Sequence, residues 1–141
     1  MASSFDEARR SDLLNPSDNA ESVQRLRDLA VAVLEDAKAQ DLQVFDLRER
    51  NTFADYMILA SGTSSRQVKA MADRLTMKLK SLGLPPPLGV EGEQGGEWVL
   101  VDLADVVVHL MLPQTRAFYN LEKLWDASTR ERSAAPPAQS L

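Results

Sequence analysis

The sequence has no cysteine and only one histidine, and these two shortages exclude whole classes of site. A chain without cysteine forms no disulfide and no thiolate metal site. With a single imidazole, any metal would have to be bound by carboxylates alone. His109 is therefore the only side chain whose ordinary pKa lies close to neutrality.

Positive charge is also scarce. The 141 residues carry 16 lysines and arginines against 21 acidic residues, a formal net charge of −5. A chain with this balance lacks the basic surface that nucleic-acid binders use. We expect no specific nucleic-acid binding, and a basic protein surface is the better matched partner.

Long hydrophobic runs are absent as well. No apolar run approaches the roughly 18 to 20 residues of a membrane-spanning helix, and the opening MASSFDEARR lacks the apolar core of a secretory signal. We therefore expect a cytoplasmic protein without membrane contact. Its 44% hydrophobic and 26% charged residues are typical of a globular protein, and the length suits one domain.

The polar ends of the chain flank this domain. Residues 1–17 are unpatterned and residues 129–141 are rich in alanine, proline and serine. Such segments bury too little apolar area to offset the entropy of ordering, so both are predicted to be flexible tails. The single domain is predicted to span residues 18–128.

Apolar spacing predicts three helices. The first repeats apolar residues from Val23 to Ala37, and Asp18 with Glu21 resembles a capping box before it. The second follows the segment GTSSR at residues 62–66, is apolar along one stripe, and is expected to end at Gly83. The last begins after Pro113.

Short segments rich in β-branched residues predict five strands, at residues 42–47, 55–60, 88–91, 97–102 and 105–112. Together the elements indicate an α/β (α+β) fold with a mixed five-stranded sheet and about three helices, in the order α-β-β-α-β-β-β-α.

The stretch WVLVDLADVVVHLM, residues 98–111, is typical of a β-hairpin that turns at Leu103 and Ala104. That turn would place Trp98 opposite His109 and Asp102 opposite Asp105. Alternation then gives one all-aliphatic face and one mixed face. The mixed face comprises Trp98, Leu100, Asp102, Asp105, Val107, His109 and Met111.

Two interpretations of the mixed face stay open on the pattern alone. Three helices are few for both faces of a five-stranded sheet, so this face could await a protein partner, or a second copy of the chain, through its aromatic and acidic residues. Alternatively a helix covers it, with Trp98 in the core and His109 half-buried. Catalysis by His109 is the weaker hypothesis, because no nucleophile or second imidazole accompanies it.

Other residues offer weaker candidates. The GTSSR segment could bind a phosphate, although Thr63, Ser64 or Ser65 as a helix N-cap explains it better. Asp55, Asp102 and Asp105 could gather around Mg²⁺ in a nucleotidyltransferase-like enzyme, but their spacing does not show that they converge. Phe118, Tyr119 and Trp125 could form a docking helix, but their helical spacing favours core packing.

Four blocks of the sequence resemble one known family. They are DYMILASGTSSRQV (55–68), GVEG (89–92), EWVLVDLADVVVHLM (97–111) and RAFYNLEKLW (116–125). In this order they are similar to the ribosomal silencing factor family, also called Iojap-like, over about residues 22–127. Ala104 departs from the family, which usually has glycine at that position.

The resemblance implies a nucleotidyltransferase-like fold without catalytic activity, cofactor or metal. It implies a translational repressor that binds protein fourteen of the large ribosomal subunit and blocks joining of the small subunit, and it allows a homodimer. The predicted apolar contacts are Trp98, Leu100, Val107 and Met111. Asp102 and Asp105 would pair with cations, and His109 would support Trp98.

Overall fold

The structure of the protein is a computed structural model that describes residues 16–49 and 53–125. Residues 1–15 and 126–141 lie outside the described residues, so the two predicted tails fall almost entirely outside them as well. The helix that follows the N-terminal segment begins at Pro16, within the predicted tail.

The described elements are α2 (Pro16–Asp36), β1 (Gln40–Asp46), β2 (Tyr56–Ser61), α3 (Ser65–Ser81), β3 (Gly89–Glu91), β4 (Trp98–Asp102), β5 (Val106–Met111), α4 (Pro113–Tyr119) and α5 (Glu122–Trp125). The predicted α/β class and element order are confirmed. The one difference is that two short helices stand where a single last helix was predicted.

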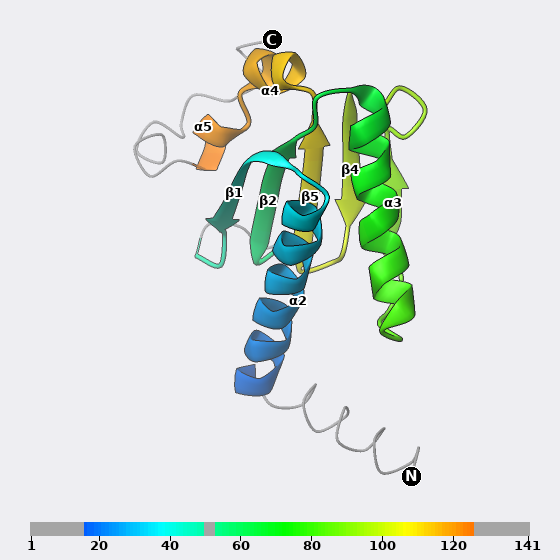
Figure 1. Ribbon diagram of the computed structural model, residues 1–141. Coiled ribbons are helices and arrows are strands. Elements are labelled where there is room, and N and C mark those ends of the chain that lie inside the picture. The colour runs from blue at the N-terminus through cyan, green and yellow to red at the C-terminus, as the bar shows by residue number, and fades with distance from the viewer. Residues whose placement is uncertain (1–15, 50–52, 126–141) are drawn as a thin grey trace.

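The five strands form a single mixed sheet in the order β1-β2-β5-β4-β3. β2 and β5 are parallel, and the other neighbouring pairs are antiparallel. The chain leaves β2 at one end of the sheet and returns through α3, β3 and β4 before it forms β5. The hairpin of β4 and β5 thus lies inside the sheet, with β3 as the edge strand beyond it (Figure 1).

The two long helices, α2 and α3, lie against the same face of the sheet (Figure 1). They bury the aliphatic face predicted for the hairpin, because alternate side chains of β4 and β5 point into the core beneath them. Val99, Val101, Val106, Val108 and Leu110 are all completely buried there. Their helical partners include Leu34 of α2 and Leu75 of α3.

Both predicted ends of α3 are confirmed. Ser64 is the N-cap, and its hydroxyl accepts a hydrogen bond from the Gln67 N–H at 3.1 Å. Gly83 has a φ of +71°, the left-handed conformation that ends many helices, and Leu84 N donates to Leu79 O at 2.9 Å. The capping box predicted for the first helix is wrong, because α2 begins at Pro16 and Asp18 lies inside its first turn.

The last helical segment divides at Asn120. This residue takes a left-handed conformation, with a φ of +54°, and its N–H donates to Arg116 O at 2.8 Å. Asparagine tolerates that conformation better than most residues. Among the described residues, no helix is long and apolar enough to span a lipid bilayer.

Candidate docking site on the sheet

The hairpin of β4 and β5 turns one residue later than predicted. Leu103 N donates to Val106 O at 2.9 Å, which leaves Ala104 and Asp105 as the turn. The Asp102 carboxylate accepts a hydrogen bond from Ala104 N at 2.8 Å, and Ala104 adopts a φ of +73°. A side-chain acceptor two residues before the amide thus fixes a turn that the Leu-Ala pair did not signal.

The predicted register is therefore wrong. Trp98 lies opposite Met111, Leu100 opposite His109 and Asp102 opposite Val107. The division into faces survives, because the pairing moves by two positions and side chains alternate with a period of two. Of the predicted mixed set, only Asp105 leaves the face, since it belongs to the turn.

The mixed face is exposed unevenly. Toward β2 it is closed, since Met57, Leu59 and Met111 have exposed fractions of 3% or less. Toward β4 it is open to solvent, and five side chains are half-buried: Trp98, Leu100, Asp102, Val107 and His109. We call these five residues the open face. Met111, predicted as an apolar contact, is completely buried and lies opposite Trp98 as support.

Trp98 is held in place by His109. The indole N–H donates to His109 Nδ1 at 2.9 Å, and the ring centroids are 5.8 Å apart. An acceptor Nδ1 in a neutral ring places the imidazole proton on Nε2. Burial lowers the pKa of His109 to about 4, so the ring stays neutral at neutral pH and remains an acceptor. His109 thus orients the tryptophan.

A further constraint on Trp98 comes from the turn between β3 and β4. Gly92 has a φ of +86°, and a Cβ atom there would overlap the Trp98 carbonyl oxygen. Only glycine fits this close approach of two backbone segments without strain. The glycine-rich turn therefore fixes the backbone at Trp98, the first residue of β4 and one end of the open face.

Aromatic side chains of α4 extend the open face beyond the sheet. Tyr119 packs on Trp98 with ring centroids 4.9 Å apart, and Phe118 meets Tyr119 edge-on at the same separation. Tyr119 is 40% exposed and Phe118 is 74% exposed. The predicted core packing of these two residues is wrong, because α4 is too short to bury more than one side. The side chain of Trp125 lies outside what the structure describes.

α4 is fixed to the sheet by a buried arginine. Arg116 is 6% exposed and donates to Ser61 Oγ at 3.0 Å and to Glu122 Oε1 at 2.9 Å. The hydroxyl belongs to β2 and the carboxylate to α5, so one guanidinium joins three elements. Sequence reasoning missed this residue, because nothing local distinguishes it from a surface arginine. Because Arg116 and Tyr119 belong to the same short helix, the element that carries Tyr119 is anchored beside Trp98.

Acidic residues lie near the hairpin turn, but not as predicted. Asp102 faces Val107 instead of Asp105, and the carboxylate that perturbs Asp105 belongs to Asp55. Partial burial and, next, repulsion from Asp55 raise the pKa of Asp105. Asp55 N also donates to Asp105 O at 2.8 Å, which joins the two segments. A cation supplied from outside would relieve this repulsion.

The two catalytic alternatives find no matching geometry. Within the described residues no three His, Cys, Asp or Glu side chains group as metal ligands, so Asp55, Asp102 and Asp105 form no such centre. At the GTSSR segment, Thr63 N donates to the Gln67 side chain at 2.6 Å and Ser64 serves as N-cap. The N–H groups of Thr63 and Gln67 are thus already bonded to side chains of the same segment.

Exposed aromatic residues beside half-buried sheet residues are typical of an α/β domain with a surface for a macromolecular partner. The family described as "Ribosomal silencing factor during starvation" matches residues 20–140. The ribosomal silencing factor RsfS of Chromobacterium violaceum is 46% identical over 103 residues, covering 73% of this chain and 84% of the relative. That of Haemophilus influenzae is 41% identical over 100 residues, covering 71% and 97%.

A solved structure agrees with these relatives. The crystal structure of a Chromobacterium violaceum protein superposes with a TM-score of 0.70 at 46% identity, covering 73% of this chain and 85% of that one. The chain belongs to the ribosomal silencing factor family, a family of non-enzymatic ribosome-binding factors.

Proposed function

We propose that this protein represses translation by binding the large ribosomal subunit and sterically blocking its joining with the small subunit. The observation that carries the proposal is the indole of Trp98, kept half-exposed by His109 and Tyr119 in a fixed orientation. A rigid, prearranged aromatic residue loses little conformational entropy on binding, which is why such residues dominate interface energetics.

The proposed partner surface is protein fourteen of the large subunit. The apolar part of the contact would come from Trp98, Leu100 and Val107. Asp102 and Asp105 lie at the turn end of the same hairpin and suit a basic surface. The net charge of −5 disfavours nonspecific binding to rRNA, so the contact is expected to be directed at protein.

The mechanism needs no chemistry by the bound domain. Its bulk occupies space that the small subunit requires, so repression depends only on affinity and position. We propose that the protein acts in the cytoplasm. If a homodimer forms on the open face, it competes with ribosome binding, because the same residues cannot serve both contacts at once.

The direct test is subunit joining. Purified large and small subunits are mixed with the protein and separated by sedimentation. The wild type should reduce the fraction of joined ribosomes, whereas Leu100→Glu should not, because it places a charge on the apolar part of the open face.

Met77→Glu is the matched control. Met77 is 68% exposed on α3, on the other side of the sheet, so this variant should behave like the wild type. Circular dichroism establishes that both variants are folded. Full inhibition of joining by a folded Leu100→Glu protein would refute the proposed site, and joining unaffected by the wild type would refute the function.

A further inference from the structure

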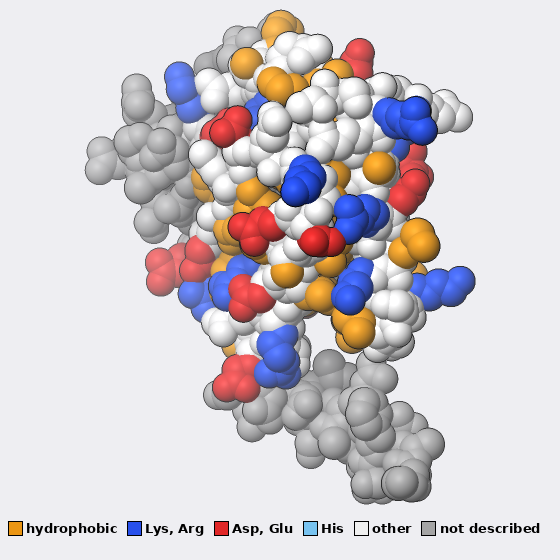
Figure 2. Space-filling view, viewed as in Figure 1, with side chains coloured by type: hydrophobic (Ala, Val, Ile, Leu, Met, Phe, Trp, Pro, Cys, Tyr) orange, Lys and Arg blue, Asp and Glu red, His pale blue; other side chains and the backbone are white. Residues whose placement is uncertain are grey.

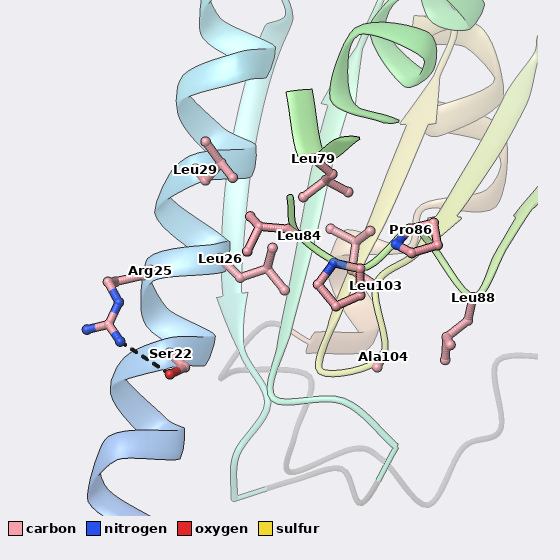
Figure 3. A pocket seen from close by; sticks show the side chains of 11 residues that line it. Ser22, Arg25, Leu26, Leu29, Leu79, Leu84, Pro86, Leu88, Leu103 and Ala104 are labelled. Atoms are coloured by element: carbon pink, nitrogen blue, oxygen red, sulfur yellow. Dashed lines mark hydrogen bonds between the residues drawn. The ribbon is translucent and has the colours of Figure 1, made fainter. Parts of the chain in front are cut away.

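An apolar groove lies at the end of the molecule away from α4. Its volume is about 570 Å³, within the range of binding cavities. Leucines dominate its lining: Leu26 and Leu29 of α2, Leu79 of α3, Leu84 and Leu88 of the following loop, and Leu103 beside the hairpin turn. Figure 3 shows Leu26 and Leu84 pointing toward one another across it.

The groove stays partly uncovered among the described residues. Leu88 at its rim is 75% exposed, an unusual state for a leucine in a lining that contains only Ser22 and Arg25 as polar residues. Figure 2 shows a hollow between the ends of α2 and α3 with hydrophobic side chains at its edge. An uncovered apolar surface of this kind marks a binding site for another apolar segment.

We propose that residues 1–15 of the same chain occupy this groove. The segment joins the described structure at Pro16, and the groove begins at Ser22 of the same helix, about 9 Å along its axis at 1.5 Å per residue. Because proline disfavours a helical conformation in the residue before it, we expect the chain to depart from the axis of α2 at this junction. The eleven residues from Phe5 to Asn15 span about 36 Å when extended, so Phe5 can reach back along α2 to the groove.

The composition of the segment suits an apolar groove. Its large apolar residues are Met1, Phe5, Leu13 and Leu14, and they are separated by polar and charged residues, so the sequence offers more than one apolar anchor. Because the segment is attached beside the groove, its effective concentration there is high, which favours it over an unattached peptide. The inference is independent of ribosome binding.

The test uses the absence of cysteine from the chain. A nitroxide attached through Pro86→Cys at the groove rim should broaden the amide signals of residues 1–10 in the full-length ¹⁵N-labelled protein to less than half their intensity. A nitroxide attached through Glu93→Cys, in the turn between β3 and β4 at the opposite end of β4, should leave them unchanged.

Variants in the segment distinguish docking from broadening that arises only because the segment is attached nearby. An unstructured segment would hold Phe5 about 18 Å from Pro16 on average, close enough for some effect. Docking requires that Phe5→Ser/Leu14→Ser raise the signals above half of their intensity without the nitroxide, whereas Arg9→Ser/Arg10→Ser, a matched change at charged positions, should leave them below half.

Three results would overturn the proposal. The first is the absence of broadening from the Pro86→Cys label. The second is equal broadening in the wild type and in Phe5→Ser/Leu14→Ser. The third is broadening in a mixture where the nitroxide and the ¹⁵N label are on different molecules, which would assign the groove to the segment of a second copy.

Discussion

The two faces of the central hairpin are built from adjacent residues of the same strands, yet they differ in exposure. Val99 and Leu110 are completely buried under the long helices, while Leu100 and His109 stay half-buried. Both sets are largely apolar, so composition alone does not produce the difference. It arises because α2 and α3 cover one face, and the short α4 reaches only the Trp98 end of the other (Figure 1).

Under the proposed function, the difference between the two faces separates stability from recognition. The helix-covered face holds the core. The outer surface of its helices carries charged side chains of both signs, lysines and arginines together with acidic residues (Figure 2). The open face instead keeps its apolar atoms near water and its tryptophan in a fixed orientation. Substitutions on the first face should therefore change folding, and those on the second should change binding.

The largest effect is expected from shortening a core leucine. Leu110→Ala should lower the free energy of unfolding by about 2–5 kcal/mol, because it leaves a cavity beneath the helices. Leu100→Ala, the same change on the open face, should cost about 1 kcal/mol, since the side chain is already half-exposed. Urea unfolding of both variants measures the difference, and equal losses would contradict the division between the faces.

Acid should destabilise the open face through His109. Folding lowers its pKa from 6.5 to about 4, so between these values the unfolded chain binds a proton that the native protein excludes. Stability is fully present above pH 6.5 and falls as the pH drops toward 4, by roughly 3 kcal/mol.

Unfolding by urea at several pH values, compared with His109→Gln, isolates this contribution. The variant lacks the titrating ring and should lose less stability over the same range. If the two proteins lose equal stability between pH 6.5 and 4, burial of the imidazole is not the cause.

The aromatic residues of α4 should contribute to binding more than to folding. Tyr119→Ala removes the ring that packs on Trp98 and is expected to weaken ribosome binding by about 1–2 kcal/mol. Phe118→Ala, which removes the most exposed ring of the set, should weaken binding by less. Titration of large subunits with each variant gives the two values, and unchanged affinity for both would confine the site to the sheet.

The smallest effect is expected at the hairpin turn. Ala104 has a φ of +73°, a conformation that costs a residue with a Cβ about 1 kcal/mol. Ala104→Gly should therefore raise the free energy of unfolding by about 0.5–1 kcal/mol, reduced by the greater freedom of glycine in the unfolded chain. Thermal unfolding measures the change, and a lower melting temperature would show that the turn is not strained.

Periodic features of the fold could be predicted from the sequence. The apolar stripe of α3, an N-cap among Thr63, Ser64 and Ser65, the end at Gly83, and the alternation of β4 and β5 each depend on neighbouring residues. The four sequence blocks also predicted the family, because they resemble ribosomal silencing factors. The faces of the hairpin came out right even with the wrong register, since a two-position change in pairing leaves them unaltered.

Features set by contacts between distant segments could not be predicted. The hairpin turn is a different case, because its signal is local: the Asp102 carboxylate accepts a hydrogen bond from Ala104 N, two residues further on, and the prediction considered only the Leu-Ala pair. Arg116 is buried because Ser61, distant in sequence, meets it beside Glu122. Phe118 and Tyr119 showed core-like spacing, but spacing does not reveal that their helix would be seven residues long.

The affinity of Trp98→Ala for purified large ribosomal subunits tests the central claim most directly. The dissociation constant should rise by about 30-fold or more, corresponding to about 2 kcal/mol for an interface hot spot, while circular dichroism shows a folded domain. Met77→Ala, on the opposite side of the molecule, should bind like the wild type. A folded Trp98→Ala protein that binds as tightly as the wild type would contradict the account.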